Sequence, residues 1–167
     1  MLGELRNAVH KFSNDGNVRC IAIAGKGKAF CAGQNLKEAL GFDEDDRTIQ
    51  RFVIEYYNPL VLEIVKCKKP VIALVNGPAV GAGAMLASIC DFTLATESSY
   101  FSFAFANIGL IPDTAGTYYL PKLVGRQLAS YLSFTGKKVP ATEAKKIGLV
   151  ADVFADSEFV EKSMEVL

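Results

Sequence analysis

The segment 70–92, with the sequence PVIALVNGPAVGAGAMLASICDF, decides the fold. Its first part, 71–75 (VIALV), is a short apolar run rich in β-branched residues, which is typical of a strand buried on both faces. Residues 76–78 (NGP) end this pattern, and the small residues at 81–83 open an apolar run of helix-forming residues from 84 to 90. The segment therefore predicts a buried strand, a turn of small residues and a buried helix in succession.

The turn at 81–83 is a potential binding site. The first N–H groups of a helix have no partners within the helix, and they lie at its positive end. Because Gly81, Ala82 and Gly83 carry at most a methyl group, another molecule can approach these N–H groups closely. The turn suits an anion, or an oxygen that becomes anionic during a reaction. Tight packing of the helix explains the small residues equally well.

The chain before this segment predicts an α/β fold. Leu2, Leu5, Val9 and Phe12 recur at helical spacing in 1–12, and 18–24 (VRCIAIA) is an apolar run typical of a second buried strand. A helix between buried strands indicates βαβ units, and hence a mainly parallel sheet. No strand precedes the first helix, which is unusual for a complete α/β domain.

Between the two strands the sequence predicts a second turn of small residues at 30–34, a helix at 35–40 and an acidic loop at 41–47. A longer helical pattern follows at 49–67, and Pro59 is expected to kink or restart it. The aromatic face of this helix can cover an apolar ligand, although such a stripe more often belongs to a core.

The second half of the chain continues the alternation of strands and helices. Strands are expected at 92–95 and 100–103, followed by a loop at 107–116 and a helix that starts near Gly116. Further helices are expected at 124–135 and 142–147 and within 156–167.

Asp113 lies in the loop at 107–116, directly before a predicted helix. An acid in this place is commonly an N-cap or a first-turn charge. The alternative is that Asp113 is a catalytic acid. Asn107, in the same loop, could then orient the substrate or the carboxylate, or it could be an ordinary loop residue.

Composition narrows the classes of function. With 167 residues, half of them hydrophobic, the chain suits a single core domain, and the 18 basic and 18 acidic residues give no electrostatic case for nucleic acid. No apolar run is long enough for a membrane span, and four well-separated cysteines are best explained as reduced thiols of a cytoplasmic protein. His10 is the single histidine, which excludes Ser-His, Cys-His and multi-His metal sites, so no metal is expected. The G-x-x-x-x-G-K-[ST] phosphate loop and the G-x-S-x-G elbow of hydrolases are both absent.

Three motifs occur together and in a fixed order: 30–36 (FCAGQNL), 76–83 (NGPAVGAG) and 109–113 (GLIPD). With 135–136 (TG) and 141–149 (ATEAKKIGL), they resemble the crotonase family of enoyl-CoA hydratases and isomerases. Within that family, 30–34, 57–60 and 110–113 look most like ring-1,2-epoxyphenylacetyl-CoA isomerases. The resemblance implies the ClpP/crotonase fold, a spiral of βα units around a mainly parallel sheet.

In the family this chain resembles, two backbone N–H groups hold the thioester oxygen of an acyl-CoA, and by motif position their counterparts here are Gln34 and Ala82. Removing a proton beside a thioester makes an enolate, whose charge collects on that oxygen and is stabilised by fixed N–H dipoles. The resemblance also implies contacts with the CoA moiety. They are expected from Lys28, Ala29, Phe30, Gly33, Gly81 and Gly83. Coenzyme A enters as part of the substrate, so no separate cofactor is expected.

Departures from the family pattern favour isomerisation over hydration. Met85 and Phe105 stand where the family's hydratases carry two glutamates, and neither side chain can move a proton. Asp113 stands where the family's isomerases carry their acid, and one carboxylate suffices to take a proton at one carbon and return it at another. Phe103, Phe105 and Met85 are candidate walls of an apolar pocket that would raise its pKa.

The resemblance also implies parts that are missing from this sequence. The family's first strand and its C-terminal helices, which complete the CoA site and build the trimer, have no counterpart here. We expect an acyl-CoA thioester as partner and assembly as a homotrimer or a dimer of trimers. Another crotonase activity, or a non-catalytic acyl-CoA-binding scaffold protein, remains as an alternative.

Overall fold

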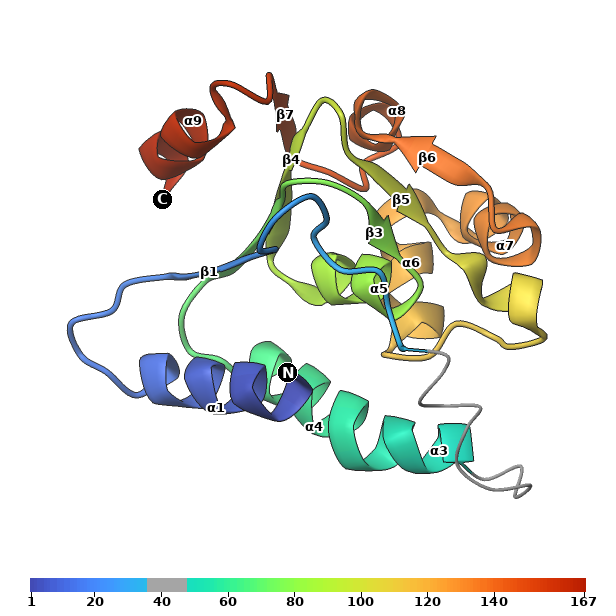
Figure 1. Cartoon of the computed structure of the whole chain (residues 1–167), viewed down its shortest axis with the longest axis horizontal. Helices are drawn as coiled ribbons and strands as arrows, with labels where there is room; N and C mark the ends of the chain where they lie inside the picture. The colour runs from blue at the N-terminus through green and yellow to red at the C-terminus, as the bar shows by residue number, and fades with distance from the viewer. Residues whose placement is uncertain (36–47) are drawn as a thin grey trace.

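Two β-sheets and the helices around them make up the protein in a computed structural model that describes residues 1–35 and 48–167 (Figure 1). The first sheet is parallel throughout, in the order β1-β2-β4-β7. Its strands are β1 (Ile21–Ala24), β2 (Val71–Val75), β4 (Phe92–Thr96) and β7 (Asp152–Phe154). In the second sheet, β5 pairs in parallel with β3 and antiparallel with β6. Its strands are β3 (Ala79–Val80), β5 (Tyr100–Ser102) and β6 (Lys138–Pro140). The prediction of a mainly parallel α/β fold is confirmed.

The helices alternate with these strands along the chain. Those before the central strand β2 are α1 (Leu2–Ser13), α3 (Thr48–Phe52), the π-helix η1 (Val53–Tyr57) and α4 (Asn58–Val65). Those after it are α5 (Ala82–Ile89), the 3-10 helix η2 (Ala104–Ile108), α6 (Gly116–Val124), α7 (Arg126–Thr135), α8 (Ala141–Lys146) and α9 (Phe159–Val166).

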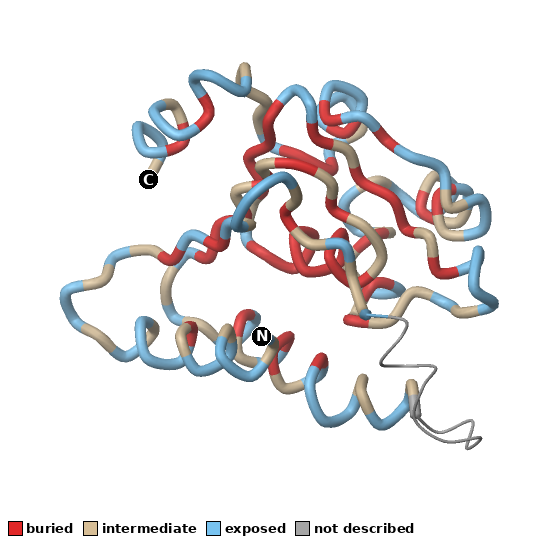
Figure 2. The backbone as a smooth tube through the Cα atoms, in the orientation of Figure 1, coloured by how far each residue is buried: buried red, intermediate tan, exposed pale blue. Residues whose placement is uncertain are grey.

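Helix α5 lies at the centre of the protein, and every one of its residues is buried. Figure 2 shows the buried residues concentrated in α5 and in the strands beside it. A helix that is apolar on all sides is stable only inside a core, which the sequence of this segment already indicated. The first turn of α5, where its free N–H groups lie, is thereby fixed in a rigid setting.

Helices α1 and α4 lie side by side in a layer below the first sheet in the view of Figure 1, and α3 continues the line of α4. Pro59 lies in the first turn of α4, so the predicted restart of the helix at this residue is confirmed. The chain approaches α4 through one π-helical turn, which the hydrophobic periodicity did not reveal. The helix expected at 35–40 and the acidic loop expected at 41–47 fall almost wholly outside the described residues.

Strand β1 differs from the prediction of a strand buried on both faces. Ile21 and Ile23 are buried, whereas Ala22 and Ala24 are exposed. One face of β1 packs into the core and the other face is exposed, and an apolar run of residues does not distinguish this case from burial on both faces.

Helix α9 packs against β4 at the other end of the sheet. There Ile72, Leu94 and Phe159 form a second, smaller apolar cluster. The predicted helix within 156–167 is therefore confirmed. The strands β3, β6 and β7 have two or three residues each and were missed, because so short a run shows no periodicity.

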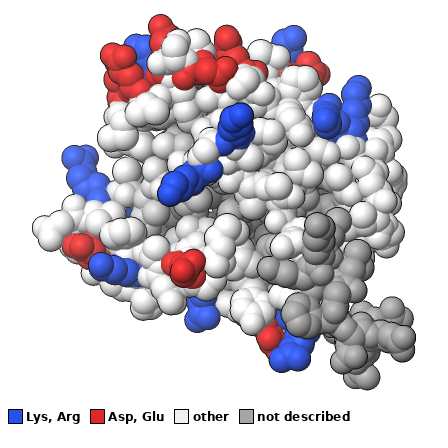
Figure 3. Space-filling view, in the orientation of Figure 1, with Lys and Arg blue, Asp and Glu red and all other residues white. Residues whose placement is uncertain are grey.

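The distribution of surface charge and the state of the cysteines agree with what the composition indicated. On the face shown in Figure 3, basic side chains are scattered and acidic ones gather mainly along the upper edge, so this face carries no continuous basic surface. All four cysteines are free thiols. Within the described ranges, no helix combines the length and the apolar character needed to cross a membrane.

Candidate active site

The two turns of small residues lie side by side. The N–H groups of Phe30 and Cys31 both donate to the carbonyl of Pro78, at 3.1 and 3.2 Å. In return, the N–H of Val80 donates to the carbonyl of Cys31 at 2.9 Å, and Cys31 pairs with Ala79 as in a parallel sheet. These bonds place the turn that follows Cys31 next to the first turn of α5.

Two glycines permit this close approach. A Cβ atom added to Gly83 would lie 2.1 Å from the carbonyl oxygen of Cys31. One added to Gly33 would lie 2.9 Å from the carbonyl oxygen of Val80 and 3.5 Å from the nitrogen of Ala82. Tight packing accounts for Gly83, and at Gly33 tight packing and a φ of +89° both favour glycine. At Gly81 an added Cβ would meet nothing within 4 Å, so the φ of +55° alone favours glycine there.

Asn76 connects the loops that follow β1 and β2. Its Oδ1 accepts a hydrogen bond from the N–H of Gly25, and its Nδ2 donates to the carbonyl of Gly27, both at 2.9 Å. A side-chain amide is suited to this bridge because it supplies one acceptor and one donor. The sequence marked Asn76 only as a strand breaker, and the bridge could not be found without the fold.

A cleft of about 210 Å³ opens where the two turns meet. Gly33, Gln34, Gly81 and Ala82 all line it. Its walls are mostly apolar, and the large side chains among them are Ile49, Phe52, Val53, Phe105, Ile108 and Leu110. An apolar cleft with a few polar groups is typical of a small-molecule site.

Of the three residues predicted to line the pocket, one does so. Phe105 lines the cleft, but Phe103 and Met85 are fully buried in the core and do not. Met85 belongs to the buried helix α5, and Phe103 follows β5 toward the interior. The sequence showed that these residues are apolar, but only the fold shows which of them border a cavity.

Two residues of the cleft have backbone N–H groups with no partner among residues 1–35 and 48–167. Ala82 is the first residue of α5, so its N–H has no acceptor within the helix. The N–H of Gln34 donates no hydrogen bond within the part of the chain that the structure describes. Both residues border the same cavity, and each can offer a hydrogen-bond donor to a ligand oxygen.

Asp113 borders the cleft as well, and it is not the N-cap of α6. The capping position belongs to Ala115, and no side chain caps this helix. The Asp113 carboxylate instead accepts a hydrogen bond of 2.8 Å from the Thr114 hydroxyl. Thr114 and Ala115 have positive φ angles of 49° and 58°. Such angles are costly for residues with a side chain, above all for a β-branched one, and strained backbone of this kind is concentrated at functional sites.

Burial raises the pKa of the Asp113 carboxyl above its ordinary value, and the hydrogen bond from Thr114 partly offsets this effect. Among the described residues, no cation pairs with the carboxylate. A carboxyl group held in this way gains and loses a proton closer to neutrality than an exposed one, as acid–base chemistry requires.

Tyr57 and Asn107 also line the cleft. The Tyr57 hydroxyl donates to the side-chain oxygen of Gln34 at 2.9 Å. The pKa of Tyr57 is raised chiefly by burial and further by the neighbouring Cys31 and Asp113, so the phenol remains protonated. In the sequence, Tyr57 stood out only as part of the motif 57–60 of the family resemblance. Its contact with Gln34 could not be found without the fold, which shows that the tyrosine is buried and that its hydroxyl has a partner.

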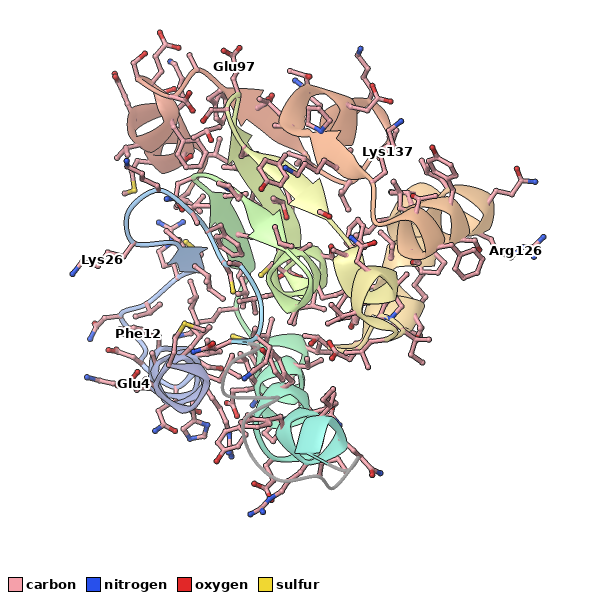
Figure 4. All side chains as sticks on the ribbon, turned by 45° about the vertical axis from the view of Figure 1, so that its right-hand side comes forward. Glu4, Phe12, Lys26, Glu97, Arg126 and Lys137 are labelled. Carbon is pink, nitrogen blue, oxygen red and sulfur yellow. The ribbon has the colours of Figure 1, made fainter. Side chains whose placement is uncertain are left out.

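The residues expected to contact CoA fall into two groups. Gly33 and Gly81 line the cleft, and Gly83 is buried directly behind it. Lys28, Ala29 and Phe30 do not line it. Lys28 is exposed on the loop after β1, where Figure 4 shows the nearby Lys26 extending away from the protein, and the Phe30 side chain packs in the core.

The chain was compared with known protein families and structures. The family model described as enoyl-CoA hydratase/isomerase matches residues 1–167. A probable enoyl-CoA hydratase of Rhodobacter capsulatus is 40% identical over 159 residues, covering 95% of this chain and 60% of that protein. The 1,2-epoxyphenylacetyl-CoA isomerase of Escherichia coli is 36% identical over 171 residues, covering 99% of this chain and 64% of that protein.

The crystal structure of enoyl-CoA hydratase from Bacillus anthracis superposes with a TM-score of 0.92 at 36% identity, covering 99% of this chain and 63% of that one. This likeness confirms the crotonase-like fold. The chain spans less than two thirds of the length of these relatives, and the region that it shares with them includes the two turns and the loop of Asp113. On this evidence the chain belongs to the enoyl-CoA hydratase/isomerase family.

Proposed function

We propose that the protein binds an acyl-CoA thioester and isomerises its acyl group through an enolate. The observation that carries the proposal is that Gln34, Ala82 and Asp113, which are far apart in the sequence, border one cleft of about 210 Å³. Two free backbone N–H groups and one carboxyl with a raised pKa are the groups that such a reaction needs.

In the proposed mechanism, the Asp113 carboxylate removes a proton from a carbon conjugated with the thioester. The electron pair of the broken C–H bond moves into the acyl group, and negative charge develops on the thioester oxygen. The N–H groups of Gln34 and Ala82 donate to this oxygen and stabilise the enolate more than the neutral substrate. The protonated Asp113 then returns the proton to a different carbon, which shifts the double bond and restores the carboxylate.

The choice of isomerisation over hydration is supported by the lining of the cleft. Asp113 is the one carboxyl group among the described residues that border it. Hydration by the family's usual route needs two acidic side chains, whereas Met85 is buried in the core and Phe105 forms part of the apolar wall. The walls favour an apolar acyl group, and the isomerase of Escherichia coli named above makes a ring rearrangement a candidate reaction.

The wider proposal extends to the rest of the protein. Lys28, Ala29 and Phe30 would border the nucleotide part of CoA, and Gly33, Gly81 and Gly83 would let the thioester approach the backbone. We also propose assembly as a homotrimer or a dimer of trimers in the cytoplasm. No cofactor other than the CoA of the substrate enters the mechanism.

The test is the substitution Asp113→Asn, with double-bond migration and exchange of the α-proton for deuterium measured on an enoyl-CoA. We expect both rates to fall by about 10²- to 10⁴-fold, the usual contribution of a general acid–base residue. Asp156→Asn, which alters an exposed aspartate, is the control and should leave both rates unchanged.

Two results would contradict this mechanism. Rates of Asp113→Asn equal to those of the wild type would exclude Asp113 as the base. Tight binding of enoyl-CoA by a wild-type protein that catalyses neither migration nor exchange would instead support a non-catalytic acyl-CoA-binding scaffold.

A further inference from the structure

The helical wall of the cleft changes its helical type at the segment that contributes Val53 and Tyr57 to the lining. Between α3 and α4 the chain forms the π-helix η1, and the N–H of Asn58 donates to the carbonyl of Val53. A π-helical turn contains an extra residue, so it shifts the face on which the following side chains lie, and such turns are frequent at functional sites. In this segment Tyr57 is buried against the cleft wall at 7% exposure, whereas its neighbour Tyr56 is 46% exposed.

The Tyr57 side chain connects this wall to the turn opposite. Its hydroxyl donates a hydrogen bond of 2.9 Å to Oε1 of Gln34, a residue 23 positions earlier in the chain. Gln34 supplies to the cleft both a free backbone N–H and this tethered side chain. The bond therefore holds the side chain of a residue that lines the cleft, and it does so from a separate structural element.

We propose that Tyr57 is a positioning residue, whose hydroxyl holds the Gln34 side chain and thereby keeps the Gln34 N–H aligned on the thioester oxygen. The inference rests on the proposed function, because it assigns to Tyr57 a part in the same oxyanion site. The hydroxyl is suited to this part since burial, together with Cys31 and Asp113, raises the pKa of Tyr57, so the phenol stays protonated and can donate.

A positioning role differs from simple packing of the ring. If only the ring matters, Tyr57→Phe keeps the apolar wall intact and changes little. If the hydroxyl positions Gln34, the same substitution leaves substrate binding unchanged but weakens stabilisation of the enolate. The expected change is a three- to tenfold fall in kcat with unchanged KM, which is the range for loss of one neutral hydrogen bond.

The experiment compares four variants of the chain with the wild type. These are Tyr57→Phe, Gln34→Met, the double variant of the two, and the control Tyr56→Phe on the exposed neighbour. Each is mixed with an enoyl-CoA that carries carbon-13 at the thioester carbonyl, and the carbonyl stretch of the bound ligand is recorded by difference infrared spectroscopy. Two aligned donors polarise the carbonyl and lower this frequency, and the measurement needs no turnover.

If the proposal is correct, Tyr57→Phe and Gln34→Met should each reduce the shift of the carbonyl frequency, and each should lower kcat to a similar extent. The double variant should be no worse than either single one, because both remove the same bond. Tyr56→Phe should match the wild type. If Tyr57→Phe fails to fold, as seen by circular dichroism, Gln34→Met breaks the bond from the other side and decides the result.

Other results of the same experiment would contradict the proposal. The role of Tyr57 would be overturned if Tyr57→Phe had the carbonyl frequency and the kcat of the wild type. It would also be overturned if the losses of the two single variants multiplied in the double variant. Either result would leave the proposed function intact. An unshifted carbonyl in the wild-type complex would overturn the oxyanion site itself, and the assignment of Tyr57 with it.

Discussion

Thr114 donates a hydrogen bond from its hydroxyl to the carboxylate of the residue before it, Asp113, across 2.8 Å. To do so, Thr114 holds a backbone with a φ of 49°, an unusual conformation for a β-branched residue. The side chain of Thr114 is buried, whereas Asp113 faces the cleft. The loop thus accepts backbone strain at Thr114 and presents the carboxylate of the preceding residue, Asp113, in a defined orientation.

This relationship predicts the effect of removing the Thr114 hydroxyl. The hydrogen bond lowers the pKa of Asp113 against the effect of burial, so Thr114→Ala should raise that pKa further. If Asp113 is the base, as proposed, it would then be ionised over a narrower pH range, and the acidic limb of the profile of kcat/KM against pH should move to higher pH. We expect activity at neutral pH to fall about two- to tenfold.

Thr114→Ser is the matched control, because it keeps the hydroxyl and should keep the wild-type profile. An acidic limb that stays in place in Thr114→Ala would show that the hydroxyl has no influence on the base.

A second prediction concerns stability rather than rate. Since the pKa of Asp113 is higher in the folded chain than its ordinary value of 3.8, ionising the carboxyl costs folding free energy. This cost is fully present above the raised pKa and disappears as the pH falls through it toward 3.8. Asp113→Asn is never charged, so it should melt a few degrees above the wild type at neutral pH.

The measurement is the thermal midpoint of both proteins across this pH range. The difference between them should shrink steadily on acidification. A variant that is less stable than the wild type at neutral pH would mean that the carboxylate makes a net favourable contribution to the fold.

A third prediction tests the close contact between the two turns. Because a Cβ atom at residue 83 would lie 2.1 Å from the backbone oxygen of Cys31, Gly83→Ala must push the turns apart. We expect a loss of about 1–3 kcal/mol or more in the free energy of unfolding, measured with urea, and a fall in acyl-CoA binding.

Gly3→Ala is the comparison for this substitution. Gly3 lies in α1 with nothing within 4 Å of an added Cβ, so alanine there should be neutral or stabilising. If Gly83→Ala is as stable as Gly3→Ala, the two turns are not held in contact as the structure shows.

Local pattern was a good guide wherever an element is long and buried. The apolar run of α5, the strand before it and the restart of the helix at Pro59 were all evident from composition and spacing. The π-helical turn before Pro59 was not, because it depends on how the two ends of the helix pack rather than on local preference. The exposed face of β1 was missed for a similar reason, since tertiary packing decides which face of a strand is covered.

The sequence by itself determined which groups are available: two turns of small residues, one acid in a Gly-Pro loop, and a single histidine, which excludes Ser-His, Cys-His and multi-His metal sites. Only the tertiary structure decided that these groups share a cavity, that Asp113 caps no helix and that Tyr57 holds Gln34. The physical reason is the distance along the chain over which each kind of interaction acts. Propensity and periodicity act over one or two turns of chain, whereas the cleft is formed by backbone hydrogen bonds and side-chain packing between segments tens of residues apart.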